Sequence, residues 1–143
     1  MTVVRRPAFR IWIPGVPKSL QSKGSKEDYV QKIREAAKSV VPRPTKSPRV
    51  DIEIFFISKR TMRADVDNVI KPILDALIGV VYMDDKQVRS VRAVAIPTDD
   101  AVHLTGRMPI KTLERLFKSE KKEFFVDIYG GLATPGFGSD PDS

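Results

Sequence analysis

Hydrophobic and polar residues alternate along four stretches of the chain, with the period of two that is typical of β-strands. In the second stretch, Phe55 and Ile57 also place apolar side chains on the face opposite the regular alternation. We therefore expect that strand to lie inside the sheet, with both faces covered. The four predicted strands are residues 9–13, 50–57, 87–96 and 124–128.

Apolar residues recur at helical spacing in three other stretches, which predicts amphipathic helices at residues 30–40, 70–78 and 109–118. Val40 is the last apolar residue of the first helix, and three prolines after it forbid its continuation. The second helix can be capped by Asp67 or Asn68. Pro72 then falls in or just after its first turn, where few backbone bonds are lost, and Gly79 is a natural end.

Polar loops are expected at residues 18–26 and 59–64, and a short apolar run with a turn, residues 80–86, leads into the third strand. The order β-α-β-α-β-α-β predicts an α/β (α+β) fold, a mixed β-sheet covered by helices in a single small domain. We expect this domain at residues 1–129. The Gly-, Pro-, Ser- and Asp-rich residues 130–143 are expected to form a disordered tail.

Length and composition fit one domain of the cytoplasm. A chain of 143 residues that is 41% hydrophobic can bury a core without covalent staples. The absence of cysteine excludes disulfides and thiolate-bound metals. No apolar run is long enough to cross a bilayer, and no signal-peptide core follows Arg5 and Arg6. We expect a soluble protein with no membrane partner.

Positive charge is concentrated in the first third of the chain. The net charge is +7, but residues 1–49 hold 12 basic and 3 acidic residues, whereas residues 50–143 hold 13 and 15. This asymmetry favours a polyanionic partner and a cation site, and a merely solvated basic face is the alternative. Trp12 and Phe9 are interpreted as core residues. Basic residues in loops near strand ends are candidates for phosphate contacts or for solubility alone: Lys18, Lys23, Lys26, Lys59, Arg60 and Arg63.

Two acids follow the buried second strand closely. Asp65 and Asp67 are two residues apart, and in extended backbone such residues point to the same side. Two carboxylates this close repel each other unless a cation or protons compensate. Oxygen ligands without His or Cys favour Mg²⁺, Mn²⁺ or Ca²⁺ over zinc. The alternative is a capping pair or a surface turn, because D-x-D is common in loops.

A lysine and a second acidic pair follow in the same region. Lys71 comes four residues after Asp67, so it emerges one turn further along the helix and can reach the same site. Asp84 and Asp85 lie in the turn after the helix, and we expect the short apolar run to return Asp85 to the helix start. The alternatives are an ordinary exposed lysine or salt bridge, and a solvated acidic turn.

Residues 65–77 (DVDNVIKPILDAL) and 79–88 (GVVYMDDKQV) together resemble the central signature of the RusA-type Holliday-junction resolvases. The specific part of the resemblance spans residues 63–88, and residues 13–18 match more loosely. Residues 14–21 depart from the Asn- and Arg-containing loop of many family members. Residues 97–123 and the Gly-rich tail are also unlike the shortest members. These departures bear on the preferred DNA structure more than on the chemistry.

The resemblance implies a homodimer that binds four-way DNA junctions and makes paired nicks with Mg²⁺. By matching positions, Asp65, Asp67 and Asp85 are the implied metal ligands and Lys71 the implied catalytic lysine. Asp84 and Asp75 match motif positions without an assigned role, and Asp75 either bonds to Lys71 or braces the helix.

The expected chemistry is phosphodiester hydrolysis. A Mg²⁺ (or Mn²⁺) ion held by carboxylates lowers the pKa of a bound water and polarises the phosphate, while Lys71 stabilises the developing negative charge. No histidine is required as a base, and His103 is interpreted as a surface or core residue. A four-way junction has two equivalent strands to cut, and one chain carries one acidic constellation, so a two-fold dimer is expected.

Two other functions remain open from the sequence. One is a nuclease that acts on flaps, forks or other branched DNA. The other is a non-catalytic basic DNA-binding module in which the acids are structural. A nuclease needs its three carboxylates within reach of one metal, and a binding module does not.

Overall fold

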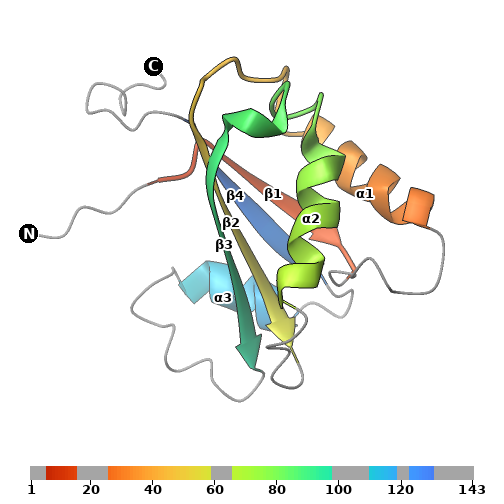
Figure 1. Cartoon of the computed structure of the whole chain (residues 1–143). Helices are drawn as coiled ribbons and strands as arrows, with labels where there is room; N and C mark the ends of the chain where they lie inside the picture. Colours follow the sequence, from red (N-terminus) through yellow and green to blue (C-terminus); the bar gives the residue numbers. More distant parts are fainter. Residues whose placement is uncertain (1–5, 16–25, 59–65, 98–109, 119–122, 131–143) are drawn as a thin grey trace, which may run out of the picture.

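The computed structural model describes residues 6–15, 26–58, 66–97, 110–118 and 123–130. Strands and helices alternate along the chain in the predicted β-α-β-α-β-α-β order (Figure 1). The elements are β1 (Phe9–Pro14), α1 (Lys26–Lys38), β2 (Val50–Ser58), α2 (Val66–Leu77), the 3₁₀ helix η1 (Asp85–Gln87), β3 (Val88–Pro97), α3 (Ile110–Lys118) and β4 (Glu123–Gly130).

The four strands form one mixed sheet in the order β1-β4-β2-β3. β4 pairs antiparallel with both β1 and β2, whereas β2 and β3 run parallel. β2 therefore lies inside the sheet, as its two apolar faces predict. The fold is a small α+β domain with a mixed sheet, which confirms the expected class.

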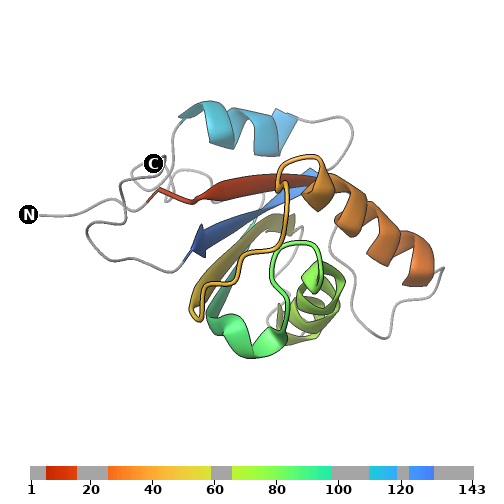
Figure 2. The same ribbon diagram turned by 90° about the horizontal axis from the view of Figure 1, so that it is seen from above.

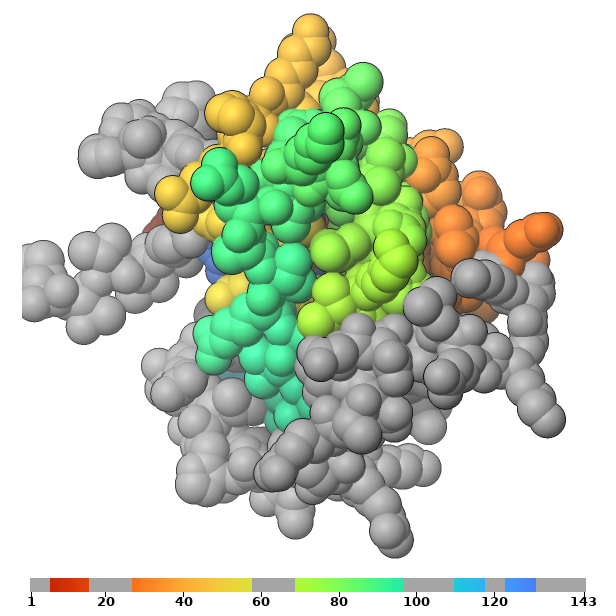
Figure 3. All heavy atoms as spheres, viewed as in Figure 1, coloured from red at the N-terminus to blue at the C-terminus, as the bar shows by residue number. Residues whose placement is uncertain are grey.

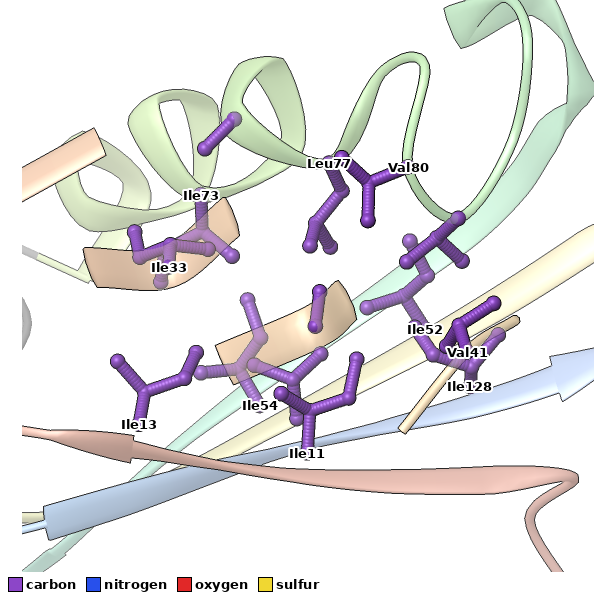
Figure 4. Close-up of a cluster of buried hydrophobic side chains, with 14 of the residues drawn as sticks. Ile11, Ile13, Ile33, Val41, Ile52, Ile54, Ile73, Leu77, Val80 and Ile128 are labelled. Carbon is purple, nitrogen blue, oxygen red and sulfur yellow. The ribbon is translucent and has the colours of Figure 1, made fainter. Parts of the chain in front are cut away.

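Helices cover both faces of the sheet. α1 and α2 lie on one face and α3 lies on the other (Figure 2). The main core fills the space between α1, α2 and the sheet, where alternate strand residues meet the apolar stripes of the helices. Figure 4 shows Ile11, Ile54, Ile33 and Ile73 converging from β1, β2, α1 and α2. All four side chains are fully buried.

A smaller core lies under α3 on the opposite face. Leu113 and Leu116 of α3 pack there with Phe125 and Ile96. Trp12 packs against this cluster, with its ring centroid 4.8 Å from that of Phe125. Phe9 is half-buried against the main core. Both aromatic residues therefore belong to cores, as expected.

A buried ion pair fixes β1 to β4 beside the smaller core. Arg10 donates to both carboxylate oxygens of Asp127, at 2.7 and 2.9 Å, and to the hydroxyl of Thr112. Asp127 is only 2% exposed. Burial raises the pKa of the Asp127 carboxyl, while the guanidinium of Arg10 opposes that rise. The bidentate geometry is that of an ionised pair.

Several expected boundaries are wrong by a few residues. α1 ends at Lys38, so Val40 lies beyond it and is exposed, and the chain buries Val41 instead. Lys26 is the first residue of α1 rather than part of a loop. Gly130 ends β4 rather than beginning the tail. Residues 131–143 of the expected tail lie outside the described residues. No helix in the described ranges combines the length and apolar character needed to span a membrane.

Candidate active site

Most of the predicted site lies where the structure describes no side chain. Asp65 and His103 lie outside the described residues, and the same is true of five of the basic candidates for DNA contact. For Asp67 and Lys26 the backbone is described, within α2 and α1. Lys71, Asp75, Asp84 and Asp85 are described in full. The five basic residues are Lys18, Lys23, Lys59, Arg60 and Arg63.

Helix α2 begins earlier than its hydrophobic pattern predicts. Val66 is its first residue, so Asp67 and Asn68 lie in the first turn and neither is the cap. The argument that Asp65 and Asp67 share one side of an extended backbone is therefore wrong for Asp67. Pro72 is the seventh residue of the helix, beyond the first turn, so its missing N–H leaves the Asn68 carbonyl without an i+4 donor. Asp67 itself is at the helix end where N–H groups are unpaired and negative charge is favoured.

Lys71 and Asp75 form an ion pair on the outer side of α2. The Nζ of Lys71 lies 3.3 Å from Oδ2 of Asp75, one turn along the helix. Both side chains are at least half exposed, at 68% and 50%. An exposed pair of this kind adds little to stability. The expected bond between Asp75 and Lys71 is confirmed, and Lys71 stays accessible to a ligand.

Two hydrogen bonds of Tyr82 hold the chain against the end of α2. Gly79 has a φ of +84°, which ends the helix, and its N–H donates to the Tyr82 carbonyl at 2.6 Å. The Tyr82 hydroxyl in turn donates to the Leu74 carbonyl at 2.6 Å. Burial raises the pKa of the Tyr82 hydroxyl, and the charges of Asp75 and Asp85 raise it further. The chain therefore stays beside the last turn of α2 as far as Tyr82, and η1 begins three residues later with Asp85.

Asp84 caps the 3₁₀ helix η1. Its Oδ1 accepts from the backbone N–H of Lys86 at 2.9 Å. This bond is the main reason why the pKa of the Asp84 carboxyl is lowered, and a hydrogen bond with the Asp85 side chain lowers it further. Asp84 thus has the structural role that its motif position left open, and it fixes the backbone at Asp85.

Gln87 forms hydrogen bonds within this turn and also to the segment that precedes β2. Its Oε1 accepts from the N–H groups of Met83 and Asp84, at 2.8 and 3.0 Å. Its Nε2 donates to the carbonyls of Thr45 and Ser47, at 2.9 and 2.7 Å. Sequence reasoning missed this residue, although an Asp followed three residues later by Gln is the spacing of a capping box.

Two of the expected ligands, Asp67 and Asp85, lie at opposite ends of α2. α2 is 12 residues long, or about 18 Å, with Asp67 in its first turn. η1, which begins with Asp85, follows beyond the last turn of α2 (Figure 1). The parallel pairing of β2 and β3 gives the same result, because Val88 pairs at the start of β2 whereas α2 follows the end of β2. The expectation that Asp85 returns to the helix start is wrong within one chain.

The carboxylate oxygens of the expected ligands fit a hard cation, but their positions within a single chain do not bring them to one ion. Carboxylates are suitable ligands for Mg²⁺, yet Asp67 and Asp85 of one chain lie too far apart to share an ion. Among the described residues, no group of three or more acids or histidines could hold a metal.

Comparison with known families gives one match. The model of the family described as "Endodeoxyribonuclease RusA" matches residues 6–107. The matched region contains β1, α1, β2, α2, η1 and β3, and with them every predicted catalytic residue. α3 and β4 follow it. A search of the curated proteins gives no match.

Proposed function

This chain belongs to the RusA family of endodeoxyribonucleases, and on that premise we propose that it resolves four-way DNA junctions by metal-dependent, paired phosphodiester hydrolysis. The family match over residues 6–107 carries the proposal. The nuclease class follows from the family. The Mg²⁺ requirement, the paired cuts and the residue roles are the proposed parts.

The proposed catalytic residues are Asp65, Asp67, Asp85 and Lys71. The three acids supply oxygen ligands of the kind that Mg²⁺ and Mn²⁺ prefer, and no cysteine competes for a softer metal. Lys71 is the charge-stabilising group. Its 68% exposure and its weak surface pairing with Asp75 leave its ammonium free to turn toward a bound phosphate.

Six basic residues are proposed to hold the DNA backbone. Phosphate contacts of this kind give affinity that is independent of sequence and falls with salt. Selectivity for a branched shape then depends on how two such surfaces are placed in a homodimer. The six are Lys18, Lys23, Lys26, Lys59, Arg60 and Arg63.

A panel of labelled DNAs tests the function. The protein is incubated with a four-way junction, a three-way flap, a fork and a linear duplex, each with Mg²⁺ or with EDTA. We expect paired nicks in the four-way junction with Mg²⁺ and none with EDTA. Preferred cutting of flaps or forks would replace junction resolution with another branched-DNA activity. Binding without any cut in Mg²⁺ or Mn²⁺ would identify a non-catalytic module.

Matched variants test the site. Asp67→Asn should abolish cutting and leave junction binding within about threefold, because the basic surface is unchanged. Glu35→Gln makes the same change from carboxylate to amide on the exposed side of α1, and should cut at the parental rate. Parental cutting by Asp67→Asn would show that the site is assigned wrongly.

A further inference from the structure

Two segments that are far apart in the sequence form one end of the domain. Residues 42–49 precede β2, and residues 83–89 contain η1 and the start of β3. Gln87 joins them, because its Nε2 donates to the carbonyls of Thr45 and Ser47 at 2.9 and 2.7 Å. Figure 3 shows the two segments next to each other at the upper end of the view, uncovered by other described residues.

Positive charge is concentrated in these two segments. They contain five basic residues and two acids, Asp84 and Asp85, which leaves a surplus of three positive charges. All five basic side chains are exposed. We call this group the η1 basic surface, and its members are Arg43, Lys46, Arg49, Lys86 and Arg89.

Only one ion pair between described residues involves this surface. The Nε of Arg49 lies 3.7 Å from Oδ2 of Asp51, and the Arg49 side chain is still 61% exposed. Asp51 is buried, and its Oδ1 accepts from the hydroxyl of Ser90. Neighbouring cations repel one another, so a surface with so few anions of its own favours binding of a polyanion.

The backbone beneath the η1 basic surface is held in place. The register of β2 and β3 shifts after Val50, so Arg89 is the extra residue of a β-bulge, a feature that redirects a side chain. Together with the two bonds of Gln87, this bulge and the prolines before β2 reduce the entropy that the surface loses on binding. Three prolines fix φ in that loop: Pro42, Pro44 and Pro48.

Phosphates of a DNA backbone are the anions that fit this surface. Asp85, a proposed metal ligand, lies within it, directly before Lys86. A DNA strand that approaches Asp84 and Asp85 is repelled by both carboxylates, and the five cations of the surface outweigh that repulsion. Lys and Arg side chains bind phosphate oxygens without reading the base sequence.

This surface is distinct from the six basic residues proposed above. β2 has nine residues, so its two ends are about 30 Å apart at about 3.3 Å per residue. The η1 basic surface lies at the start of β2, which Arg49 directly precedes. Three of the six earlier residues instead follow the end of β2 in the sequence: Lys59, Arg60 and Arg63.

We propose that the η1 basic surface is a second DNA-binding surface, which holds backbone phosphates of the strand that passes Asp85. This inference rests on the proposed nuclease function, because that function supplies DNA as the partner. The contacts do not depend on the base sequence, and they weaken as the salt concentration rises.

Neutralising two lysines tests the surface. Lys46→Gln combined with Lys86→Gln removes two of its five cations and breaks no ion pair between described residues. Binding of a labelled four-way junction is followed by fluorescence anisotropy in EDTA, at several salt concentrations. The Kd should rise about tenfold or more at physiological salt. The slope of log Kd against log salt should fall by about 1.8, or about 0.9 for each lost phosphate contact.

Two other lysines give the matched control. Lys32→Gln combined with Lys111→Gln makes the same change of charge on α1 and α3, where both side chains are exposed. The control should bind within about twofold of the parent, which excludes an effect of net charge alone. Both double variants should unfold within about 2 °C of the parental Tm, since exposed lysines contribute little to stability. Equal weakening in the two double variants, or none in either, would overturn the proposal.

Cross-linking locates the DNA without removing any charge. The chain has no native cysteine, so Met83→Cys and Ile110→Cys each carry a single photoreactive group. Both native side chains are exposed, at 58% and 65%, and Met83 lies in the segment of η1 whereas Ile110 begins α3. The group at Met83→Cys should cross-link the junction far more efficiently than the group at Ile110→Cys. Equal or weaker cross-linking from Met83→Cys would overturn the proposal.

Cutting assays separate this surface from the nuclease function. If the parent binds the junction through the surface but cuts it in neither Mg²⁺ nor Mn²⁺, the nuclease function fails and the surface stands. If Lys46→Gln combined with Lys86→Gln binds and cuts like the parent, the surface fails and the nuclease function stands.

Discussion

Replacing Gln87 with alanine should loosen the turn that carries Asp85 without disturbing either core. Gln87 makes four hydrogen bonds, and the two to the carbonyls of Thr45 and Ser47 are partly buried. Water can replace its exposed bonds to Met83 and Asp84, so the cost comes mainly from the two carbonyls. At about 1 kcal/mol each, Gln87→Ala should lose roughly 2 kcal/mol of unfolding free energy.

This loss is measurable by thermal and urea unfolding followed by circular dichroism. For a domain of this size, roughly 2 kcal/mol corresponds to a fall of about 6 °C in Tm. Gln31→Ala is the matched control, because Gln31 makes one exposed bond to Glu35 and should change stability by less than about 0.5 kcal/mol. Gln87→Glu keeps the acceptor for the backbone and loses the donor to the carbonyls, so it should be as unstable as Gln87→Ala.

Activity should fall further than the folded fraction explains. Gln87 touches no reacting atom, but it fixes η1 and so positions Asp85. At 25 °C, where the variant is folded, the cutting rate should fall about tenfold with little change in the affinity for DNA. A variant with parental stability would show that these four bonds do not hold the turn. A less stable variant with parental cutting would show that the turn need not be fixed for catalysis.

Three other changes test separate parts of the structure. Lys71→Ala should lower kcat by about 100-fold while Asp75→Asn lowers it far less, and an unchanged kcat with a raised KM would make Lys71 a binding residue. Arg10→Met should cost about 3 kcal/mol in urea unfolding at pH 7, because it leaves the buried carboxylate of Asp127 unpaired. Burial raises the pKa of Asp127, so this loss should shrink as the pH falls toward that raised value and the carboxyl becomes neutral; a pH-independent loss would contradict the ion pair. The pKa of Asp84 is lowered in the folded protein, so this carboxylate stabilises the fold above pH 3.8, its usual pKa. That stabilisation is lost as the pH falls through the lowered pKa. Asp84→Ala should lack this loss in acid unfolding curves.

The elements could be predicted because the apolar residues of each segment recur with one period, which is two in a strand and near 3.6 in a helix. The apolar side chains of Phe55 and Ile57 correctly predict that β2 lies inside the sheet, and Gly79 correctly predicts the end of α2. The boundaries were predicted less well, since the periodic patterns were counted from Val30 and Ile70, whereas the helices begin at Lys26 and Val66. The first turns also contribute to the core, through Tyr29 in α1 and Val69 in α2.

The placement of Asp85 was not predicted, because no strand directions were assigned from the sequence. A strand, a helix and a strand in succession favour a parallel crossover, in which the second strand begins at the far end of the helix. The parallel pairing of β2 and β3 puts Asp85 at the end of α2 opposite to Asp67. The strand order β1-β4-β2-β3 has no such local signal, because β4 enters between β1 and β2 from much later in the sequence.

The central position of β4 also determines when the protein can fold during its synthesis. β4 supplies the pairing partner of both β1 and β2, and its contacts with β1 span more than 100 residues of chain, as between Arg10 and Asp127. Until the ribosome has released residues 123–130, β1 has no neighbour and β2 has one open side. Such long-range closure slows folding. A nascent chain stalled before this strand would leave β1 unpaired and one edge of β2 open, and chaperones or proteases would meet it before DNA does.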